Sequence, residues 1–223
     1  MIRKQNLVVI FRTDASRQIG SGHVMRCLTL AEALRDAGGT IAFITRNHLG
    51  NLNDYIKSKG FNVHSLPDRN ESNMQQGLSG YEKWLGVKQD HDAKDTIQAL
   101  SGIHPDWLIV DHYALDNNWE EELRPYTKNI MAIDDLANRC HDCDVLLDQN
   151  LFENMSKRYQ RKVPDKCILL LGPHFALLHP DYPRLRNKAR SRKGPLNHLL
   201  VFFGGADRYN LTGLTLSALE QIN

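Results

Sequence analysis

The chain has 223 residues, of which 41% are hydrophobic and 24% charged, and its formal net charge is only +2 at pH 7. A balance this even argues against a nucleic-acid or anionic-membrane partner, so we expect small-molecule partners. No apolar run approaches the roughly 18 residues of a membrane span, and no export signal is visible, which predicts a cytoplasmic protein. The four cysteines are therefore expected to be reduced thiols rather than a disulfide framework.

Short apolar runs recur along the chain and predict strands. Several do not alternate apolar with polar residues, as expected of parallel strands covered on both faces. The runs are Leu7–Phe11, Ile41–Thr45, Asn62–Leu66, Trp107–Val110, Ile130–Ile133, Val145–Leu147, Cys167–Leu171 and Leu199–Phe203. Helical patterns lie between them, most clearly from His23 to Ala37, and the glycine pair that follows ends this pattern. Strands that alternate with helices predict a doubly wound α/β fold.

The composition changes after the seventh predicted strand. Three prolines between Leu171 and Gly194 are joined by a run of basic residues from Arg184 to Lys193 that contains no acid. Aromatic residues that stack on bases do not alternate with these charges, so a solvated linker explains the run better than a nucleic-acid contact.

A strand-loop-helix pattern restarts at Leu199–Phe203, passes through a glycine turn and continues into a helix from Leu211. One such unit cannot bury a domain core by itself. We therefore expect either a two-domain protein that is truncated in this chain or a second domain that another chain completes. The expected parts are a Rossmann-like domain over 1–172, a linker over 173–195, and the first unit of a nucleotide-binding domain over 196–223.

A glycine-hinged loop between the first strand and the first helix carries the most informative chemical signal, because it delivers His23 to the start of a helix. Backbone N–H groups at a helix N-terminus attract anions, and an imidazole can move a proton at neutral pH. Gly20 and Gly22 allow the backbone to approach a ligand closely. His23 is therefore a candidate general base, and the structural alternative is a local hydrogen bond at the helix start.

Three further side chains belong to the same strand end and loop. Asp14 and Ser16 either orient the imidazole, bind a sugar hydroxyl, or hydrogen-bond to the backbone of their own loop. Arg12 pairs either with a phosphate or with Asp14. All three are candidate substrate-binding residues.

A second candidate group follows the strand that ends near Val110. Asp111 and His112 form either a charged dyad in the ligand crevice or a structural cap of their loop, and Tyr113 follows them.

Two patterns that suggest a metal are better explained otherwise. Asp134 and Asp135 are adjacent, and neighbouring side chains in extended chain point in opposite directions. Cys140 and Cys143 lack the two further ligands that a structural zinc site needs. We expect no metal and no cofactor.

The second glycine turn consists of Gly204 and Gly205, followed closely by Asp207, and it precedes the last predicted helix. A turn of this kind aims backbone amides at a pyrophosphate. It lacks the lysine of a P-loop and the third glycine of a dinucleotide fingerprint. A nucleoside diphosphate is consistent with the turn without either motif.

Taken in order, these motifs resemble the UDP-2,4-diacetamido-2,4,6-trideoxy-β-L-altropyranose hydrolases of pseudaminic acid biosynthesis, the PseG family, over nearly the whole chain. The first block is the most specific. The matching segments are Arg12–Ser16, Ile19–Cys27, Val110–Tyr113, Ile133–Ala137, Leu146–Asn150, Leu171–Leu178 and Phe203–Asp207.

The resemblance implies a GT-B arrangement, in which two Rossmann-like domains face each other as in MurG-type glycosyltransferases. It also implies metal-independent, inverting hydrolysis, in which water attacks the anomeric carbon and UDP leaves, in a pathway linked to flagellin glycosylation and cell-surface polysaccharide. His23 would be the general base, and Gly20 and Gly22 would shape the loop near the sugar and diphosphate. Gly204, Gly205 and Asp207 would lie on the nucleotide side.

Two other functions stay open from the sequence. A GT-B glycosyltransferase would pass the sugar of a UDP-sugar donor to an acceptor hydroxyl instead of to water, and fold does not settle the acceptor. A non-catalytic nucleotide-sugar-binding fragment is the alternative that the incomplete second domain suggests.

Overall fold

The computed structural model describes residues 7–68, 78, 80–189, 193–204, 207 and 209–222. The chain divides into two units, Met1–Leu177 and Leu178–Asn223. Among the described residues, no helix is both long enough and apolar enough to cross a bilayer.

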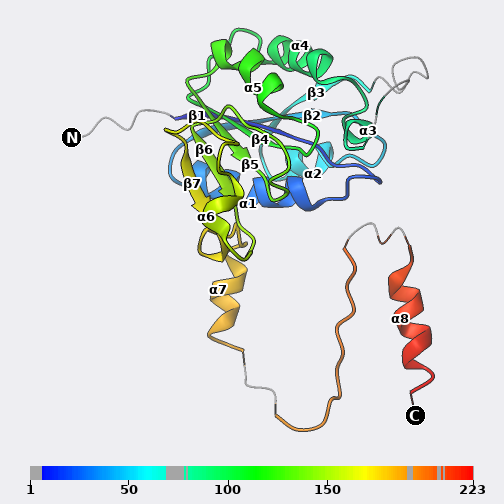
Figure 1. Cartoon of the computed structure of the whole chain (residues 1–223). Coiled ribbons are helices and arrows are strands. Elements are labelled where there is room, and N and C mark those ends of the chain that lie inside the picture. The colour runs from blue at the N-terminus through cyan, green and yellow to red at the C-terminus, as the bar shows by residue number, and fades with distance from the viewer. Residues whose placement is uncertain are drawn as a thin grey trace. The chain divides into compact units, whose positions relative to one another are not determined.

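The first unit is built on a parallel sheet whose seven strands follow the order β3-β2-β1-β4-β5-β6-β7 (Figure 1). The strands predicted from the sequence up to Leu171 are all present, and their ends differ from the predicted ones by at most two residues. Their bounds are β1 (Val8–Thr13), β2 (Thr40–Arg46), β3 (Asn62–Leu66), β4 (Trp107–Asp111), β5 (Asn129–Ile133), β6 (Val145–Asp148) and β7 (Ile168–Leu171).

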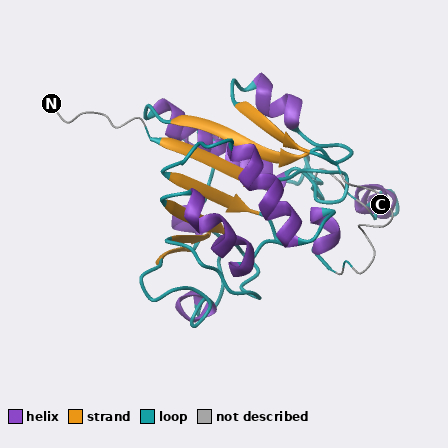
Figure 2. Ribbon diagram, turned by 90° about the horizontal axis from the view of Figure 1, so that it is seen from above, coloured by secondary structure: helices purple, strands orange, loops and turns teal. Residues whose placement is uncertain are grey.

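The winding direction of the sheet reverses between β1 and β4. The chain passes from β1 outward to β2 and β3, and then returns to place β4 on the other side of β1. Neighbouring strands run the same way (Figure 2), so their carboxyl ends share one edge. Thr13 of β1 is in register with Asp111 of β4 at this edge. Open α/β sheets bind ligands at such a reversal point.

Helices cover both faces of the sheet, which confirms the doubly wound α/β fold. Val9 and Phe11 of β1 pack on one side with α1 (Gly22–Asp36) and α2 (Asn53–Ser58), and Ile10 packs on the other side with α4 (Gln89–Leu100) and α5 (Asn117–Leu123). In Figure 1, α4 and α5 lie above the sheet and α1 and α2 below it. The remaining helices of this unit are α3 (Glu82–Leu85), η1 (Arg124–Tyr126), α6 (Met155–Arg158) and η2 (Pro173–Phe175).

The second unit contains α7 (Asp181–Arg186) and α8 (Leu211–Leu219). The helix predicted from Leu211 is confirmed. The strand predicted over Leu199–Phe203 is not formed, because a strand needs a neighbour for its ladder of hydrogen bonds and the described part of this unit contains no other strand. The expected linker also holds two short helices, η2 and α7. Pro183 is compatible with α7 because it lies in the first turn, where its missing N–H would have no helical partner.

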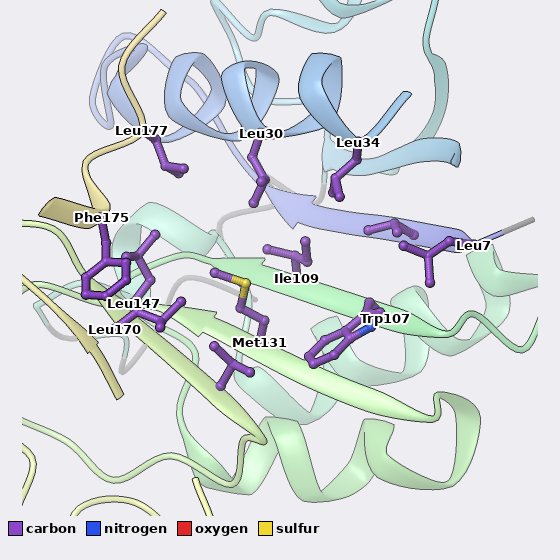
Figure 3. A pocket seen from close by; sticks show the side chains of 12 residues that line it. Leu7, Leu30, Leu34, Trp107, Ile109, Met131, Leu147, Leu170, Phe175 and Leu177 are labelled. Carbon is purple, nitrogen blue, oxygen red and sulfur yellow. The ribbon is translucent and has the colours of Figure 1, made fainter. Parts of the chain in front are cut away.

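A cavity of about 350 Å³ lies on the α1 side of the sheet (Figure 3). It runs from the start of β1 and β4 toward Phe175 and Leu177, and Leu30 and Leu34 of α1 form one wall. Its walls are aliphatic and aromatic side chains, without a titratable group. This cavity therefore offers no acid, base or nucleophile, and the chemistry of the fold has to be sought at the edge of the sheet.

Candidate functional site

The site at the carboxyl edge brings together two side chains that are 88 residues apart in sequence. His23 lies in the first turn of α1, and Asp111 is the last residue of β4. The Nδ1 atom of His23 lies 2.6 Å from Oδ1 of Asp111. Asp111 is fully buried, and His23 retains 7% of its surface exposed. The glycine loop and the reversal of winding therefore place an imidazole against a buried carboxylate.

Arg26, one turn further along α1, holds the carboxylate from the other side. Its Nε donates to Oδ2 of Asp111 at 2.6 Å, and its Nη2 donates to Oδ1 at 2.7 Å. Burial by itself would raise the pKa of Asp111, but the neighbouring His23 and Arg26 outweigh burial and hold that pKa below its usual range. Asp111 is therefore ionised at neutral pH and can only accept hydrogen bonds.

An ionised Asp111 determines the tautomer of His23. The proton of the ring lies on Nδ1 and is donated to the carboxylate, so Nε2 of the neutral imidazole carries a lone pair. An imidazole oriented in this way can take a proton from water or from a hydroxyl group.

The ring of Tyr113 packs edge-on against His23, with 4.6 Å between the ring centroids. Burial, followed by the nearby carboxylate of Asp135, raises the pKa of Tyr113. The phenol therefore keeps its proton at neutral pH. Asp135 itself is held by Arg26, whose Nη1 donates to it at 3.2 Å.

Arg12 and Asp14 are part of a buried ion network instead of the site's surface. Of the two partners predicted for Arg12, the structure shows Asp14, with Nη1 to Oδ1 at 2.7 Å. Arg12 also donates to both carboxylate oxygens of Asp92 in α4. Its side chain is 0% exposed, so no surface is left for a phosphate. Asp14 is equally buried, and the prediction that it orients His23 or binds a sugar hydroxyl is corrected. Its Oδ2 faces two other imidazoles and lies 3.7 Å from Nε2 of His48 and 3.6 Å from Nε2 of His112.

Of the two alternatives for Asp111 and His112, the structure does not form the charged dyad. Neighbouring residues at the end of a strand point to opposite sides, so Asp111 faces His23 while His112 faces Asp14. The Nδ1 atom of His112 accepts the N–H of Ala114 at 3.1 Å. Burial lowers the pKa of His112 to about 3, which keeps the ring neutral.

The glycine loop is held in shape by its own backbone and by Ser16. The hydroxyl of Ser16 accepts the N–H groups of Gln18 and Ile19 at 3.1 and 2.9 Å. Gly20 has φ +85°, which a residue with a side chain rarely adopts, and the space around Gly20 and Gly22 is open. The side chain of Ser21 does not cap α1, so the first N–H groups of the helix are available to an anion.

In the second unit, Gly204 has φ +81° in its turn, and Gly205 lies outside the described residues. The carboxylate of Asp207 accepts the N–H groups of Leu211 and Thr212 at 2.8 and 3.0 Å and so caps α8. Hydrogen bonds from Thr212 lower the pKa of Asp207. The role of this turn toward a nucleotide stays a prediction.

Sequence reasoning missed several members of the site, although one signal could have found His48. This residue follows the carboxyl end of β2, the same position that singled out Asp14 after β1. Arg46 and Asp92 complete the buried ion network with an Nη2–Oδ2 distance of 2.6 Å. Asp92 lies inside a helix, where no local pattern marks it.

Among the residues that the structure describes, no group of three or more acidic, cysteine or histidine side chains is arranged to hold a metal.

No family model matches the chain. It is 28% identical over 205 residues to the UDP-2,4-diacetamido-2,4,6-trideoxy-β-L-altropyranose hydrolase of Campylobacter jejuni, a match that covers 92% of this chain and 62% of the hydrolase. It is 23% identical over 211 residues to the uncharacterized protein MJ1062 of Methanocaldococcus jannaschii, covering 93% of this chain and 38% of that protein. The chain is thus related to a UDP-sugar hydrolase and spans less than two thirds of the length of either relative.

A solved structure with similarity to the chain is MurG of Acinetobacter baumannii. The TM-score is 0.46 at 12% sequence identity, and the match covers 73% of this chain and 44% of MurG.

Proposed function

We propose that this chain hydrolyses UDP-2,4-diacetamido-2,4,6-trideoxy-β-L-altropyranose to the free sugar and UDP. The observation that carries the proposal is the contact between His23 and Asp111, 2.6 Å long, at the carboxyl edge of the sheet. The 28% identity to a hydrolase of this name supports the substrate. A GT-B arrangement, with a nucleotide-binding second domain that begins near residue 196, is part of the same proposal.

In the proposed reaction, Nε2 of His23 takes a proton from water as the water attacks the anomeric carbon. The C–O bond to the diphosphate breaks on the opposite side of the sugar ring, so the configuration inverts and UDP leaves. Asp111 stabilises the imidazolium that forms, and general-base catalysis of this kind contributes about 10²–10⁴-fold. Because UDP is a good leaving group, no second carboxylate of the glycosidase type is needed. The uncapped N–H groups of α1 offer a place for developing negative charge.

Proton NMR of the sugar nucleotide incubated with this chain tests the proposal. We expect UDP and the free sugar to appear together, with the inverted anomer first. His23→Ala is expected to lower this rate by about 10²–10⁴-fold, while UDP affinity stays within about threefold because the base acts on water and not on the nucleotide.

Three outcomes would contradict the proposal. A near-normal rate in the folded His23→Ala variant removes His23 from the mechanism. Sugar transfer that depends on an added acceptor, with negligible UDP release in water, identifies a glycosyltransferase. Saturable binding of the sugar nucleotide without any turnover identifies a non-catalytic binding protein.

A further inference from the structure

A second cavity, of about 170 Å³, opens at the carboxyl edge of the sheet between the loop after β1, the loop after β2, and α3. We call it the His48 pocket. It is lined by Ser16, Arg17, Gln18, His48, Leu49, Lys83, Trp84 and Gly86. Sites that enclose a whole drug-sized ligand usually measure about 300–1,000 Å³. The His48 pocket therefore suits a single substituent of a larger ligand.

The loops that form the pocket are tied together. The N–H of Arg17 donates to the carbonyl of Leu49 at 3.2 Å, which joins the glycine loop to the loop after β2. Gly86 has φ +78°, and a Cβ at this position would lie 3.2 Å from Cε1 of His48. The absence of a side chain at Gly86 thus allows the imidazole to lie in the wall of the pocket.

The carboxylate of Asp14 lies beside the buried Nε2 atom of the His48 ring. Burial by itself would raise the pKa of Asp14, but Arg12 and its other neighbours hold that pKa well below its usual range. The Oδ1 atom of Asp14 accepts hydrogen bonds from Arg12 and from the N–H of Arg46. Its Oδ2 makes no hydrogen bond, is inaccessible to solvent, and lies 3.7 Å from Nε2 of His48 and 3.6 Å from Nε2 of His112.

An ionised oxygen in this position draws the protons of both imidazoles toward it. With its proton on Nε2, the His48 ring has Nδ1 as a hydrogen-bond acceptor. Nε2 is inaccessible. His48 lines the pocket beside Gly86, and its Cε1 and Nδ1 atoms are the ones nearest to the position that a Gly86 Cβ would take, at 3.2 and 3.9 Å. The pocket therefore presents one fixed hydrogen-bond acceptor at its wall.

The other walls complete a specific chemical pattern. Leu49 and Trp84 are apolar, while Arg17, Gln18 and Lys83 carry N–H donors at the rim. An acceptor, an apolar wall and a set of donors match the N–H, the methyl and the carbonyl of an acetamido group. A free hydroxyl group would use the acceptor but leave the apolar wall uncovered. A phosphate would bring no N–H to Nδ1.

The pocket is also connected to the candidate base. Trp84 in its wall packs against Tyr113, with 5.8 Å between the ring centroids, and Tyr113 packs edge-on against His23. A sugar ring lying along these aromatic side chains could place one substituent in the His48 pocket and its anomeric carbon toward His23.

We propose that the His48 pocket binds one acetamido group of the sugar, with Nδ1 of His48 accepting its N–H, and that Asp14 is the positioning residue that holds His48 in this tautomer. The choice of a UDP-sugar as ligand rests on the proposed function. Binding can nevertheless be measured without turnover, so failure of the pocket and failure of the hydrolase proposal are distinguishable.

The test compares the diacetamido sugar nucleotide with two analogues, in each of which one acetamido group is replaced by an acetoxy group. The ester keeps the shape, carbonyl and methyl but lacks the N–H. Dissociation constants are measured by ligand-observed NMR titration on the His23→Gln variant, so that substrate is not consumed. We expect one of the two analogues to bind about tenfold more weakly than the diacetamido compound. Equal affinity for all three compounds, or no saturable binding at all, overturns the proposal.

Two substitutions in the same background assign the discrimination to His48. In His48→Gln the amide reaches the position of Nε2, so the acceptor toward the pocket is lost and the tenfold preference should disappear. In His48→Asn the amide oxygen can occupy the position of Nδ1, so most of the preference should persist. A preference that survives His48→Gln, or that is lost equally in both variants, contradicts the assignment.

Discussion

At the scale of single residues, Asp111 serves two partners with one carboxylate. It accepts the proton of His23 on one side and two hydrogen bonds from Arg26 on the other. Arg26 neutralises the buried charge, and this leaves Asp111 free to orient the imidazole without taking its proton. Charge-assisted contacts of this kind fix a catalytic tautomer.

Replacement of that carboxylate should therefore affect turnover more than binding. In Asp111→Asn the side-chain amide can donate to Nδ1 of His23, which moves the ring proton to Nε2 and removes the base. We predict that kcat for UDP release falls by about 10²–10⁴-fold, with KM little changed. Steady-state kinetics measure both constants, and circular dichroism confirms that the variant is folded. A kcat close to that of the unaltered chain would show that Asp111 does not orient the base.

At the scale of elements, a buried ion network joins α4 to the sheet. Asp92 of α4 accepts hydrogen bonds from Arg12 of β1, from Arg46 of β2 and from the indole of Trp119 in α5. All of the charged groups of this contact are inaccessible to solvent. The network links two strands and two helices directly behind the His48 pocket, because Asp14 is bound to the same Arg12.

Removal of the charge of Asp92 leaves two arginines without their shared counter-ion in the interior. We predict that Asp92→Asn lowers the free energy of unfolding by about 3–5 kcal/mol, measured by urea denaturation. Asp90→Asn is the matched control, since Asp90 lies on the same helix with half of its side chain exposed, and its effect should stay within about 0.5 kcal/mol. Equal effects of the two substitutions would show that the buried network contributes nothing specific.

At the scale of the whole molecule, two buried histidines couple stability to pH in opposite directions. Burial lowers the pKa of His112 to about 3. Burial alone would lower the pKa of His141 as well, but hydrogen bonds with Asp134 and Glu120 raise it to about 9. Both groups titrate near pH 6.5 in an unfolded chain, to within about one unit.

The sign of each contribution follows from these shifts. The contribution of His141 to the free energy of unfolding is complete below about pH 6.5 and is lost as the pH rises through about 9. The contribution of His112 is complete above about pH 6.5 and is lost as the pH falls toward about 3. The lowered pKa of Asp111 adds to the loss below about pH 4. We predict a maximum of the unfolding free energy near about pH 6.5, measured by urea denaturation at several pH values. His141→Gln should remove the alkaline decline, and a flat profile up to about pH 9 in the unaltered chain would contradict the prediction.

Much of the fold of the first unit could be predicted because its signals are local. Apolar runs that lack alternation identified the strands from β1 to β7, and the position of His23 and Asp111 after two strands placed both at one edge of the sheet. The prediction of a strand over Leu199–Phe203 was wrong because strand formation does not depend on local signals alone. Its residues fit a strand, but a strand also requires a neighbour.

The pairing of side chains within the site could not be predicted, because it depends on tertiary packing. Arg12 and Asp92 are separated by 80 residues, and His23 and Asp111 by 88. The sequence left Asp111 undecided between a dyad with His112 and a cap of its loop, and it left Arg12 undecided between Asp14 and phosphate. The packing of α4 and α1 against the sheet determines that Arg12 pairs with Asp92 and that His23 contacts Asp111.

Hydrolysis in water labelled with oxygen-18 tests most directly whether His23 activates water for attack on the anomeric carbon. The diacetamido sugar nucleotide is incubated with the unaltered chain and with His23→Gln, and both products are analysed by mass spectrometry. The proposed mechanism predicts that the label appears on the sugar, that none appears on UDP, and that the substitution removes most of the labelled sugar. Label on the terminal phosphate of UDP, or labelled sugar formed equally well without His23, would contradict it.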